Sequence, residues 1–373
     1  MSIKPIVSVI SAAILLSACG GGTGDTSPTT QDNSPATGRL SVAITDAPVA
    51  DLASVVVEFT GVTLKPADGD EIAISLTDVN GAIVDTKSID LKTLTGSASE
   101  VLFNNIAVPA GAYHWIRLNV NAAKDGVNDS YVQLTEGGDA IELDIPSGAE
   151  SGLKLVSGFT VAQGGSSDFT IDFDLSKSIT VTKPNSAAPE YKLRPALRLV
   201  DNLDVGAISV TVDGTMINEV CGISEELSTN FGAVYLWQGS DAQMELLAAQ
   251  SERLITTALV DASGTADIGF ILSGPYTVGY TCDNALDSVS GVTLVSGTEL
   301  AANTTVTING DSGPEELTIT ENTVLGQEAL ATPDTPLADG STAGALIVFH
   351  DTQNVSVTVN EVTEVIINQI ATE

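Results

Sequence analysis

Apolar and polar residues alternate with a period of two along most apolar segments of this chain. The alternation is plain over residues 40–45, 116–120, 169–175 and 208–212, and Gly, Asp, Asn or Pro bound the segments. Because successive side chains of a strand point to opposite faces of a sheet, the pattern predicts short strands with one buried face each. Such strands need a second sheet to cover that face, and we therefore expect an all-β chain of β-sandwich domains.

The length of the chain fits two domains of this kind. We expect an N-terminal sandwich over residues 38–203 and an acidic C-terminal sandwich with a loop-rich extension over residues 204–373. The last apolar run, residues 355–367, should add edge strands to the second domain. Residues 242–259 have the Ala, Leu, Gln and Glu content of a helix but lie between strand patterns without a clear cap, so both structures remain open there.

The N-terminus has the parts of an export signal: Lys4 supplies a positive charge, and residues 6–16 form an apolar run too short to span a bilayer. The following Leu16-Ser17-Ala18-Cys19 resembles the lipobox of bacterial lipoproteins, whose cysteine carries the lipid after cleavage. We therefore expect a signal peptide at residues 1–18 and lipidation of Cys19. Gly20 stands where related bacteria use Asp for inner-membrane retention, so the resemblance implies the outer membrane, with the periplasmic and surface faces both open.

Residues 20–36 are rich in Gly, Thr, Ser and Pro and contain no large apolar side chain. Such a segment cannot bury a core, which predicts that residues 19–37 are the lipidated cysteine and a flexible tether. The ends of a coil of this length lie roughly 20–25 Å apart on average. The tether would therefore hold the folded domains clear of the lipid surface.

The chain is strongly acidic, with a net charge of −34. Residues 20–198 carry 12 basic and 23 acidic side chains, whereas residues 199–373 carry one basic side chain, Arg253, and 25 acidic ones. Nucleic acids and anionic lipid surfaces bind through Lys and Arg, so we exclude nucleic acid as a partner and expect membrane contact only through the N-terminal lipid.

Acidity of this kind favours solubility in salt, with Ca²⁺ binding as the weaker alternative. Residues 68–71 and 125–129 come nearest to a calcium loop, but their Asp, Asn and Gly are typical of turns. Asp172 and Asp174 alternate with apolar residues and are expected on the solvated face of a strand. We therefore expect no metal site and no cofactor.

Three cysteines occur in the chain, and lipid on Cys19 leaves Cys221 and Cys282 as a pair. In an exported protein an even remainder predicts a disulfide. The chain-entropy model assigns a closed loop of about 60 residues a stabilisation of around 4 kcal/mol.

No catalytic constellation stands out. The two histidines, His114 and His350, lie in different expected domains, and neither Gly-x-Ser-x-Gly nor His-Glu-x-x-His occurs. Aromatic side chains could instead form a platform for sugars, and the candidates are Trp115, Trp237 and Tyr235, with Tyr113 beside Trp115. Core packing is the competing interpretation for each, because the chain has few aromatic residues to fill two cores.

Four segments, Gly38–Pro48, Val55–Lys65, Val108–Tyr113 and Tyr191–Pro195, resemble in order the landmarks of the bacterial family called domain of unknown function 4382. This resemblance covers about residues 38–200, occurs on envelope lipoproteins and implies no catalytic residues. Gly274–Val278 resembles a strand of transthyretin-like and carboxypeptidase-regulatory-like sandwiches, which are grouped with carbohydrate-binding-like folds. That second likeness is an analogy of fold and sets no function.

The sequence thus predicts a non-catalytic, lipid-anchored protein of the cell envelope with a structural or recognition role. One alternative is a carbohydrate-binding module of the envelope, and a less favoured one is a hydrolase that uses carboxylates. Either an envelope glycan or another protein would serve as the partner.

Overall fold

The computed structural model describes the chain from Ala36 onward, and Ala36–Glu373 forms one compact unit. The described residues are 36–47, 49, 51–146, 152–182, 189–194, 196–222, 231–240, 253–283, 292–294, 296–310, 313–327, 329–331, 335–341, 343 and 349–368. The expected signal peptide, Cys19 and the tether as far as residue 35 lie outside them. Among the described residues, no helix has the length and apolar character needed to cross a membrane.

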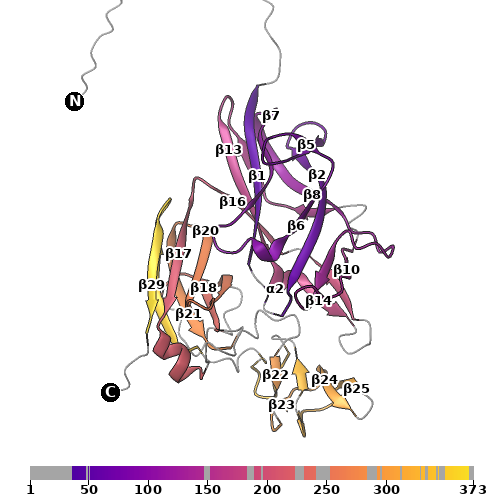
Figure 1. The fold of residues 1–373 in the computed structure, drawn as a ribbon, viewed down its shortest axis with the longest axis vertical. Coiled ribbons are helices and arrows are strands. Elements are labelled where there is room, and N and C mark those ends of the chain that lie inside the picture. The colour runs from indigo at the N-terminus through magenta and orange to yellow at the C-terminus, as the bar shows by residue number, and fades with distance from the viewer. Residues whose placement is uncertain are drawn as a thin grey trace, which may run out of the picture. The chain divides into compact units, whose positions relative to one another are not determined.

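The first part of the chain is a sandwich of two sheets (Figure 1). The smaller sheet has the order β16 (Leu197–Asp201), β13 (Ser166–Asp174), β1 (Thr37–Ala47) and β7 (Glu100–Pro109). The larger has the order β11 (Leu153–Leu155), β8 (Gly111–Asn121), β2 (Ser54–Pro66), β9 (Tyr131–Gln133), β10 (Ile141–Asp144), β15 (Glu190–Leu193) and β14 (Ile179–Thr182). In that sheet β12 (Phe159–Val161) also pairs with β8, and β3 (Ile72–Ile74) and β6 (Lys87–Asp90) pair with β2.

Short elements complete this sandwich. They are the two-stranded pair β4 (Leu76–Thr77) and β5 (Ile83–Val84), the 3₁₀ helix η1 (Leu91–Thr93) and the helical turn α2 (Leu175–Ser178). The carboxylates of Asp90 and Asp174 cap the two helical elements by accepting from the backbone amides of Lys92 and Lys177.

One continuous apolar core lies between the two sheets. The strand faces predicted from the alternation supply it: Leu40, Val42 and Ile44 from β1 pack with Ile116 and Leu118 from β8. The pairing of β1 with β13 is parallel, and it places Thr45 opposite Asp172 and Asp46 opposite Phe173.

A second sandwich follows, with its own core. Its three-stranded sheet has the order β20 (Thr265–Leu272), β17 (Val205–Val212) and β29 (Val362–Ile367). Its four-stranded sheet has the order β19 (Leu254–Leu259), β18 (Ala233–Gln238), β21 (Gly274–Thr281) and β28 (Asp351–Val357), and the π-helical turn η2 (Met216–Val220) follows β17.

The C-terminal strands β28 and β29 lie at sheet edges, as the last apolar run led us to expect. Of the ambiguous segment 242–259, the structure describes residues 253–259, and β19 occupies most of them as a strand paired with β18. Residues 242–252 lie outside the described residues.

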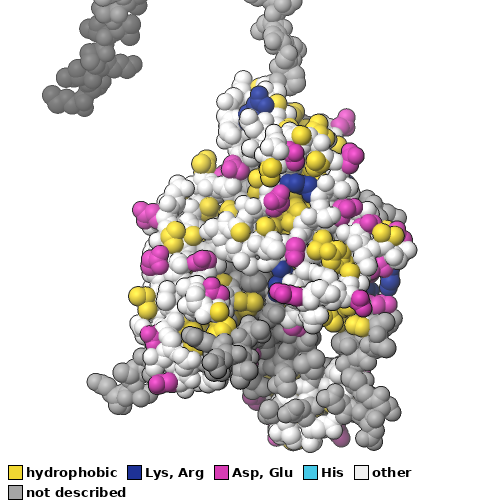
Figure 2. All heavy atoms as spheres, viewed as in Figure 1, with side chains coloured by type: hydrophobic (Ala, Val, Ile, Leu, Met, Phe, Trp, Pro, Cys, Tyr) yellow, Lys and Arg dark blue, Asp and Glu magenta, His cyan; other side chains and the backbone are white. Residues whose placement is uncertain are grey.

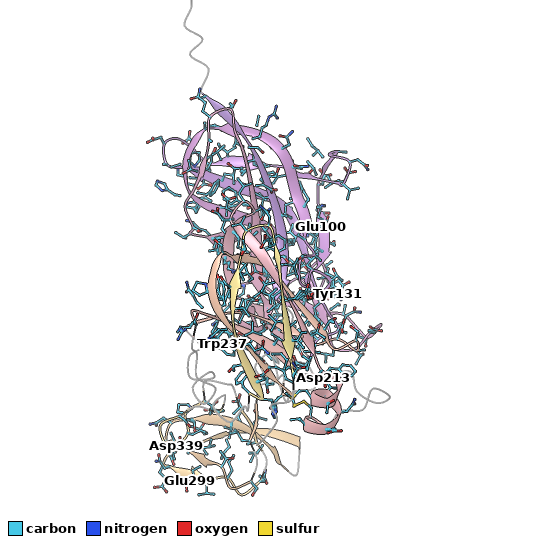
Figure 3. The ribbon with its side chains drawn as sticks, turned by 90° about the vertical axis from the view of Figure 1, so that its left-hand side faces the viewer. Glu100, Tyr131, Asp213, Trp237, Glu299 and Asp339 are labelled. Carbon is cyan, nitrogen blue, oxygen red and sulfur yellow. A yellow bond between two sulfur atoms is a disulfide. The ribbon has the colours of Figure 1, made fainter. Side chains whose placement is uncertain are left out.

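A third, small apolar core is distinct from the core of the second sandwich. The sequence pattern did not predict this third core. It is built on β22 (Val292–Leu294), β27 (Ala329–Ala331), β24 (Thr305–Gly310) and β25 (Gly313–Thr318), with the pair β23 (Glu299–Leu300) and β26 (Thr323–Val324). Glu299 and Asp339 mark this part in Figure 3. The expectation of an all-β chain of sandwiches is confirmed, and the described residues between β21 and β28 also hold this separate apolar core.

Candidate functional site

On strand β8, Ile116 and Leu118 are core residues. Trp115 and Arg117 alternate with them, so these two side chains lie on the face of the larger sheet that points away from the core. The register places Lys154 of β11 opposite Arg117. These three residues form what we call the Trp115 cluster. The guanidinium carbon of Arg117 lies 4.6 Å from the centroid of the indole ring, and the Lys154 ammonium lies 4.3 Å from it.

Cation–π attraction holds these charges over the ring and contributes about 0.5–2 kcal/mol for each cation. The indole is 9% exposed, because the two basic side chains lie over it. A neutral sugar could therefore reach the ring face only after Arg117 and Lys154 moved. The surface that the cluster offers is positive charge on an aromatic base.

The two cations are only partly neutralised. Arg117 Nη1 lies 3.8 Å from Glu71 Oε2, which is a long ion pair at a half-exposed carboxylate. Arg117 Nε is buried and has no hydrogen-bond partner among the described residues. Lys154 is exposed and takes part in no ion pair within the described ranges. Figure 2 shows how sparse Lys and Arg are on one face of the molecule, where Asp and Glu are scattered widely.

The other proposed platform residues are core residues, which corrects the sequence prediction. Tyr235 is 0% exposed and Trp237 is 1% exposed, and both pack edge-on against Phe349 at ring-centroid distances of 5.4 and 5.2 Å. Figure 3 labels Trp237 among the strands of the second sandwich. Strand β18 is buried along both of its faces, a condition that periodicity alone does not reveal.

Tyr113 is also buried, and it stacks on Phe159 with ring centroids 4.8 Å apart. Its hydroxyl donates to the carbonyl of Pro109, so the polar group is satisfied inside the protein. Desolvation raises the pKa of this phenol. Of the four aromatic candidates, only Trp115 therefore lies on an outer sheet face.

Cys221 and Cys282 form a disulfide with an S–S distance of 1.97 Å and a Cα–Cα distance of 5.4 Å. It joins the residue that ends η2 to the residue that follows β21. The Tyr280 hydroxyl lies 3.3 Å from Cys221 Sγ and donates to the carbonyl of Phe231. Burial raises the pKa of Tyr280 to about 12, so this phenol stays neutral beside the disulfide.

A pair of buried carboxylates is the feature that sequence analysis missed. Asp172 was expected on a solvated face, but it is only 9% exposed, and Arg198 binds its Oδ2 through Nε at 2.7 Å and Nη2 at 2.6 Å. Asp46 is 5% exposed, and neither of its carboxylate oxygens has a hydrogen-bond partner within the described residues. The only sequence signal was the place of Asp46 in the Thr45-Asp46-Ala47-Pro48 segment of the family resemblance.

The surroundings of Asp46 favour its neutral form. Burial raises the pKa of this carboxyl well above its ordinary value, and the neighbouring Asp172 and Asp174 raise it further. The backbone amide of Leu175, which lies near the carboxyl but does not meet hydrogen-bond geometry, and the ammonium of Lys92 lower the pKa by smaller amounts. Burial also raises the pKa of Asp172, although Arg198 opposes that shift.

The structure does not bring the two histidines together in one site. His114 is exposed on β8, whereas His350 is partly buried just before β28, where desolvation lowers its pKa. Within the described ranges, no three His, Cys, Asp or Glu side chains are grouped so that they could hold a metal ion.

Comparison with known proteins matches residues 37–195 to the family described as Domain of unknown function (DUF4382). No curated protein matches the chain. A Pseudomonas aeruginosa protein provisionally assigned as carbohydrate-binding aligns at a TM-score of 0.19 with 11% identity, over 46% of this chain and 92% of its own. The minor pilin GBS52 of Streptococcus agalactiae aligns at a TM-score of 0.17 with 9% identity, over 89% and 97%. MbnP of Methylosinus trichosporium aligns at 0.18 with 13% identity, over 39% and 76%.

TM-scores this low carry no argument about fold or function. The family match stands on its own and agrees with the landmarks seen in the sequence, from the strand that becomes β1 to the end of β15. Residues 37–195, the first sandwich apart from its last strand β16, match the model of the DUF4382 family, and we call this part of the chain the DUF4382 domain.

Proposed function

We propose that this chain is a non-catalytic recognition protein of the bacterial cell envelope, held there by lipid on Cys19, and that the Trp115 cluster is its binding surface. The observation that carries the proposal is the pair of cations held over the indole ring, 4.6 and 4.3 Å from its centroid, in a chain with a net charge of −34. The lipobox-like Leu16–Cys19 and the disulfide of the second sandwich support an exported location.

The chemistry of the cluster favours a ligand that carries carboxylates. A guanidinium can bind a carboxylate through two parallel hydrogen bonds, and the Nε of Arg117 is a donor that no described residue uses. Lys154 adds a second charge beside it, since the two residues are register partners. Once the two side chains turn toward the ligand, the indole is uncovered as an apolar base for a sugar ring. Acidic envelope polysaccharide, which combines sugar rings with carboxylates, therefore fits better than neutral glycan.

Calorimetric titration of the full mature chain with polygalacturonate, and with neutral dextran as comparison, tests this proposal. We expect binding of the uronate polymer that weakens as salt rises, because exposed charges are screened. Arg117→Ala, Lys154→Ala and Trp115→Ala should each weaken it at least tenfold. Arg39→Ala is the matched control: it removes one charge from an exposed residue of β1, which belongs to the other sheet, and should bind as the wild type does.

Three results would contradict the proposal. One is equal binding of dextran and polygalacturonate, and another is an equal loss in the Arg39→Ala control. The third is the absence of uronate binding at low salt. Arg117 and Lys154 would then stabilise the fold through Trp115 without binding a ligand.

A further inference from the structure

The two sandwiches contact each other around a small cavity of about 10 Å³. Asp46, Asp172 and Gly96 line it from the DUF4382 domain, and Asp267 and Gly269 line it from β20 of the second sandwich. A cavity of this size holds about one water molecule. It cannot supply the hydration shell that a charged carboxylate requires.

The backbones around the cavity are closely packed. A Cβ atom on Gly269 would lie 2.3 Å from the carbonyl oxygen of Gly96, and one on Gly96 would lie 3.0 Å from the Cβ of Asp267. Gly96 also has a φ of +64°, in the left-handed region that favours glycine. Both carboxylate oxygens of Asp46 are buried at this contact, although a larger cavity of about 290 Å³ shares Gly96 and Asp267 with the small one. Water can therefore reach these oxygens only if the groups around them move apart.

Charged groups reach Asp46 from several elements. Asp172 and Asp174 approach from β13, and Lys92 from η1. Arg198 of β16 neutralises Asp172, and Lys177 of α2 bridges to Asp174 at 2.7 Å.

Asp267 of β20 lines the same cavity from the other sandwich and accepts a hydrogen bond from Ser209. Lys92 directs its ammonium to the carbonyls of Val49 and Leu52, so it is shared with backbone acceptors. Asp46 is thus left as the carboxyl without a dedicated counter-charge.

We propose that Asp46 is a proton-binding residue that couples the contact between the two sandwiches to pH. With the proton bound, the neutral acid is compatible with a closed, nearly dry contact. When the proton leaves, the carboxylate stands beside the ionised Asp172 in a cavity too small to hydrate it, and the contact opens to admit water. The assignment is independent of the Trp115 cluster and does not require a ligand.

The direction of the pH effect follows from the raised pKa of Asp46. A carboxyl that binds its proton more tightly in the closed state favours closure while the proton is present. Closure is therefore favoured under acid conditions and weakens as pH rises through the raised value.

Amide hydrogen exchange of the full mature chain at pH 5 and pH 8, corrected for the intrinsic rate at each pH, tests the proposal. The reporters are the backbone amides of Thr256, Thr257 and Gly269, all of which line the cavity. In the wild type we expect protection at pH 5 that falls at least tenfold by pH 8. Asp46→Asn, which mimics the neutral acid, should keep the acid level of protection at both values. Asp70→Asn, at an exposed residue of the β2–β3 loop, should follow the wild type.

Equal protection of the wild type at both pH values would overturn the proposal, as would a pH dependence that survives in Asp46→Asn. Carbon-detected NMR of the wild type gives a check that needs no variant. If every Asp carboxyl of the DUF4382 domain titrates within the ordinary pH range, the proposal is refuted. Millimolar Ca²⁺ that raises the protection of the wild type at pH 8 to its level at pH 5 would show that a cation can take the place of the proton, and would overturn the assignment of the site to a proton alone.

Discussion

Asp172 and Asp46 lie on adjacent, parallel strands of one sheet, yet of the two carboxylates only that of Asp172 is hydrogen-bonded to a positive charge within the described residues. Arg198 Nη2 is 2.6 Å from Asp172 Oδ2, whereas both carboxylate oxygens of Asp46 have no hydrogen-bond partner among the described residues. The charge of Asp172 raises the pKa of Asp46, so ionisation of one carboxyl disfavours ionisation of the other in this buried site. The arginine therefore determines which carboxyl is ionised and leaves the proton to the other.

Asp46→Asn should stabilise the protein at high pH. The folded-state pKa of Asp46 lies above its unfolded value, so folding takes up a proton and the destabilising charge appears only as pH rises through the folded value. We expect the free energy of unfolding to rise by on the order of 1 kcal/mol at pH 8 and to change much less at pH 4. Urea unfolding across this range measures it, and Asp70→Asn should show no such trend. A larger gain at pH 4 than at pH 8 would contradict the assignment.

Arg198→Ala should have the opposite effect, because it leaves Asp172 buried without its partner. Breaking a buried pair costs roughly 3–5 kcal/mol, and the 30% exposure of the Arg198 side chain reduces that to about 2 kcal/mol. The loss should be greatest at neutral pH and shrink in acid, where Asp172 can accept a proton.

The double variant Arg198→Ala/Asp172→Asn supplies the control for this pair. Removing both charges should recover most of the stability that Arg198→Ala loses. If urea midpoints show the double variant to be as unstable as the single one, packing of the arginine stem, and not charge, accounts for the loss.

Reduction of the disulfide should destabilise the second sandwich selectively. The cross-link closes a loop with a sequence separation of 61, for which the chain-entropy model gives about 4 kcal/mol. Differential scanning calorimetry with and without reductant should show a lower melting temperature for the second sandwich, with the melting temperature of the DUF4382 domain unchanged. Trp237 lies in the second sandwich, and loss of its transition in Trp237→Phe fluorescence melts identifies which transition belongs to that part. Cys221→Ser/Cys282→Ser should reproduce the lower melting temperature, and an unchanged thermogram would contradict it.

Trp115→Ala and Trp237→Ala should separate binding from stability. Trp237 is 1% exposed in the second sandwich, and its truncation should cost roughly 3–5 kcal/mol while leaving uronate binding intact under folded conditions. Trp115 lies outside the apolar core, so its truncation should lower stability much less and remove binding. Paired thermal melts and titrations decide the matter, and a reversed pattern would sink the functional assignment of the Trp115 cluster.

Cys19 should carry lipid in the mature protein. Mass spectrometry of the N-terminal peptide should find a diacylglyceryl adduct on this residue, and Cys19→Ser should release the chain from the membrane fraction. An unmodified N-terminus that begins elsewhere would refute the anchor while leaving the binding surface to be judged separately.

Local pattern identified several strands well. The alternation over residues 40–45 and 169–175 is that of β1 and β13, whose inward faces are core residues. It did not reveal that these strands are parallel neighbours, because a parallel pair joins segments distant in the chain and leaves no turn between them. For the same reason the exposed-looking Asp172 proved to be buried: the outer face of β13 is covered at Thr170 and Asp172, while Asp168 on the same face is exposed.

The sequence predicted one of the three residues of the Trp115 cluster. Trp115 was chosen as an aromatic residue, but Arg117 and Lys154 join it only through the pairing of β8 with β11. Tyr235 and Trp237 were chosen on the same grounds and proved to be core residues beside Phe349.

The sequence by itself determined the all-β class, the DUF4382 resemblance and the pairing of Cys221 with Cys282, because period-two alternation, a local motif and the number of cysteines are properties of the chain alone. Tertiary structure decided which aromatic side chain lies on an outer sheet face and which buried carboxyl has no hydrogen-bond partner among the described residues. Burial and charge pairing depend on the segments that cover each strand face, and those segments are brought there by long-range contacts that no local pattern encodes.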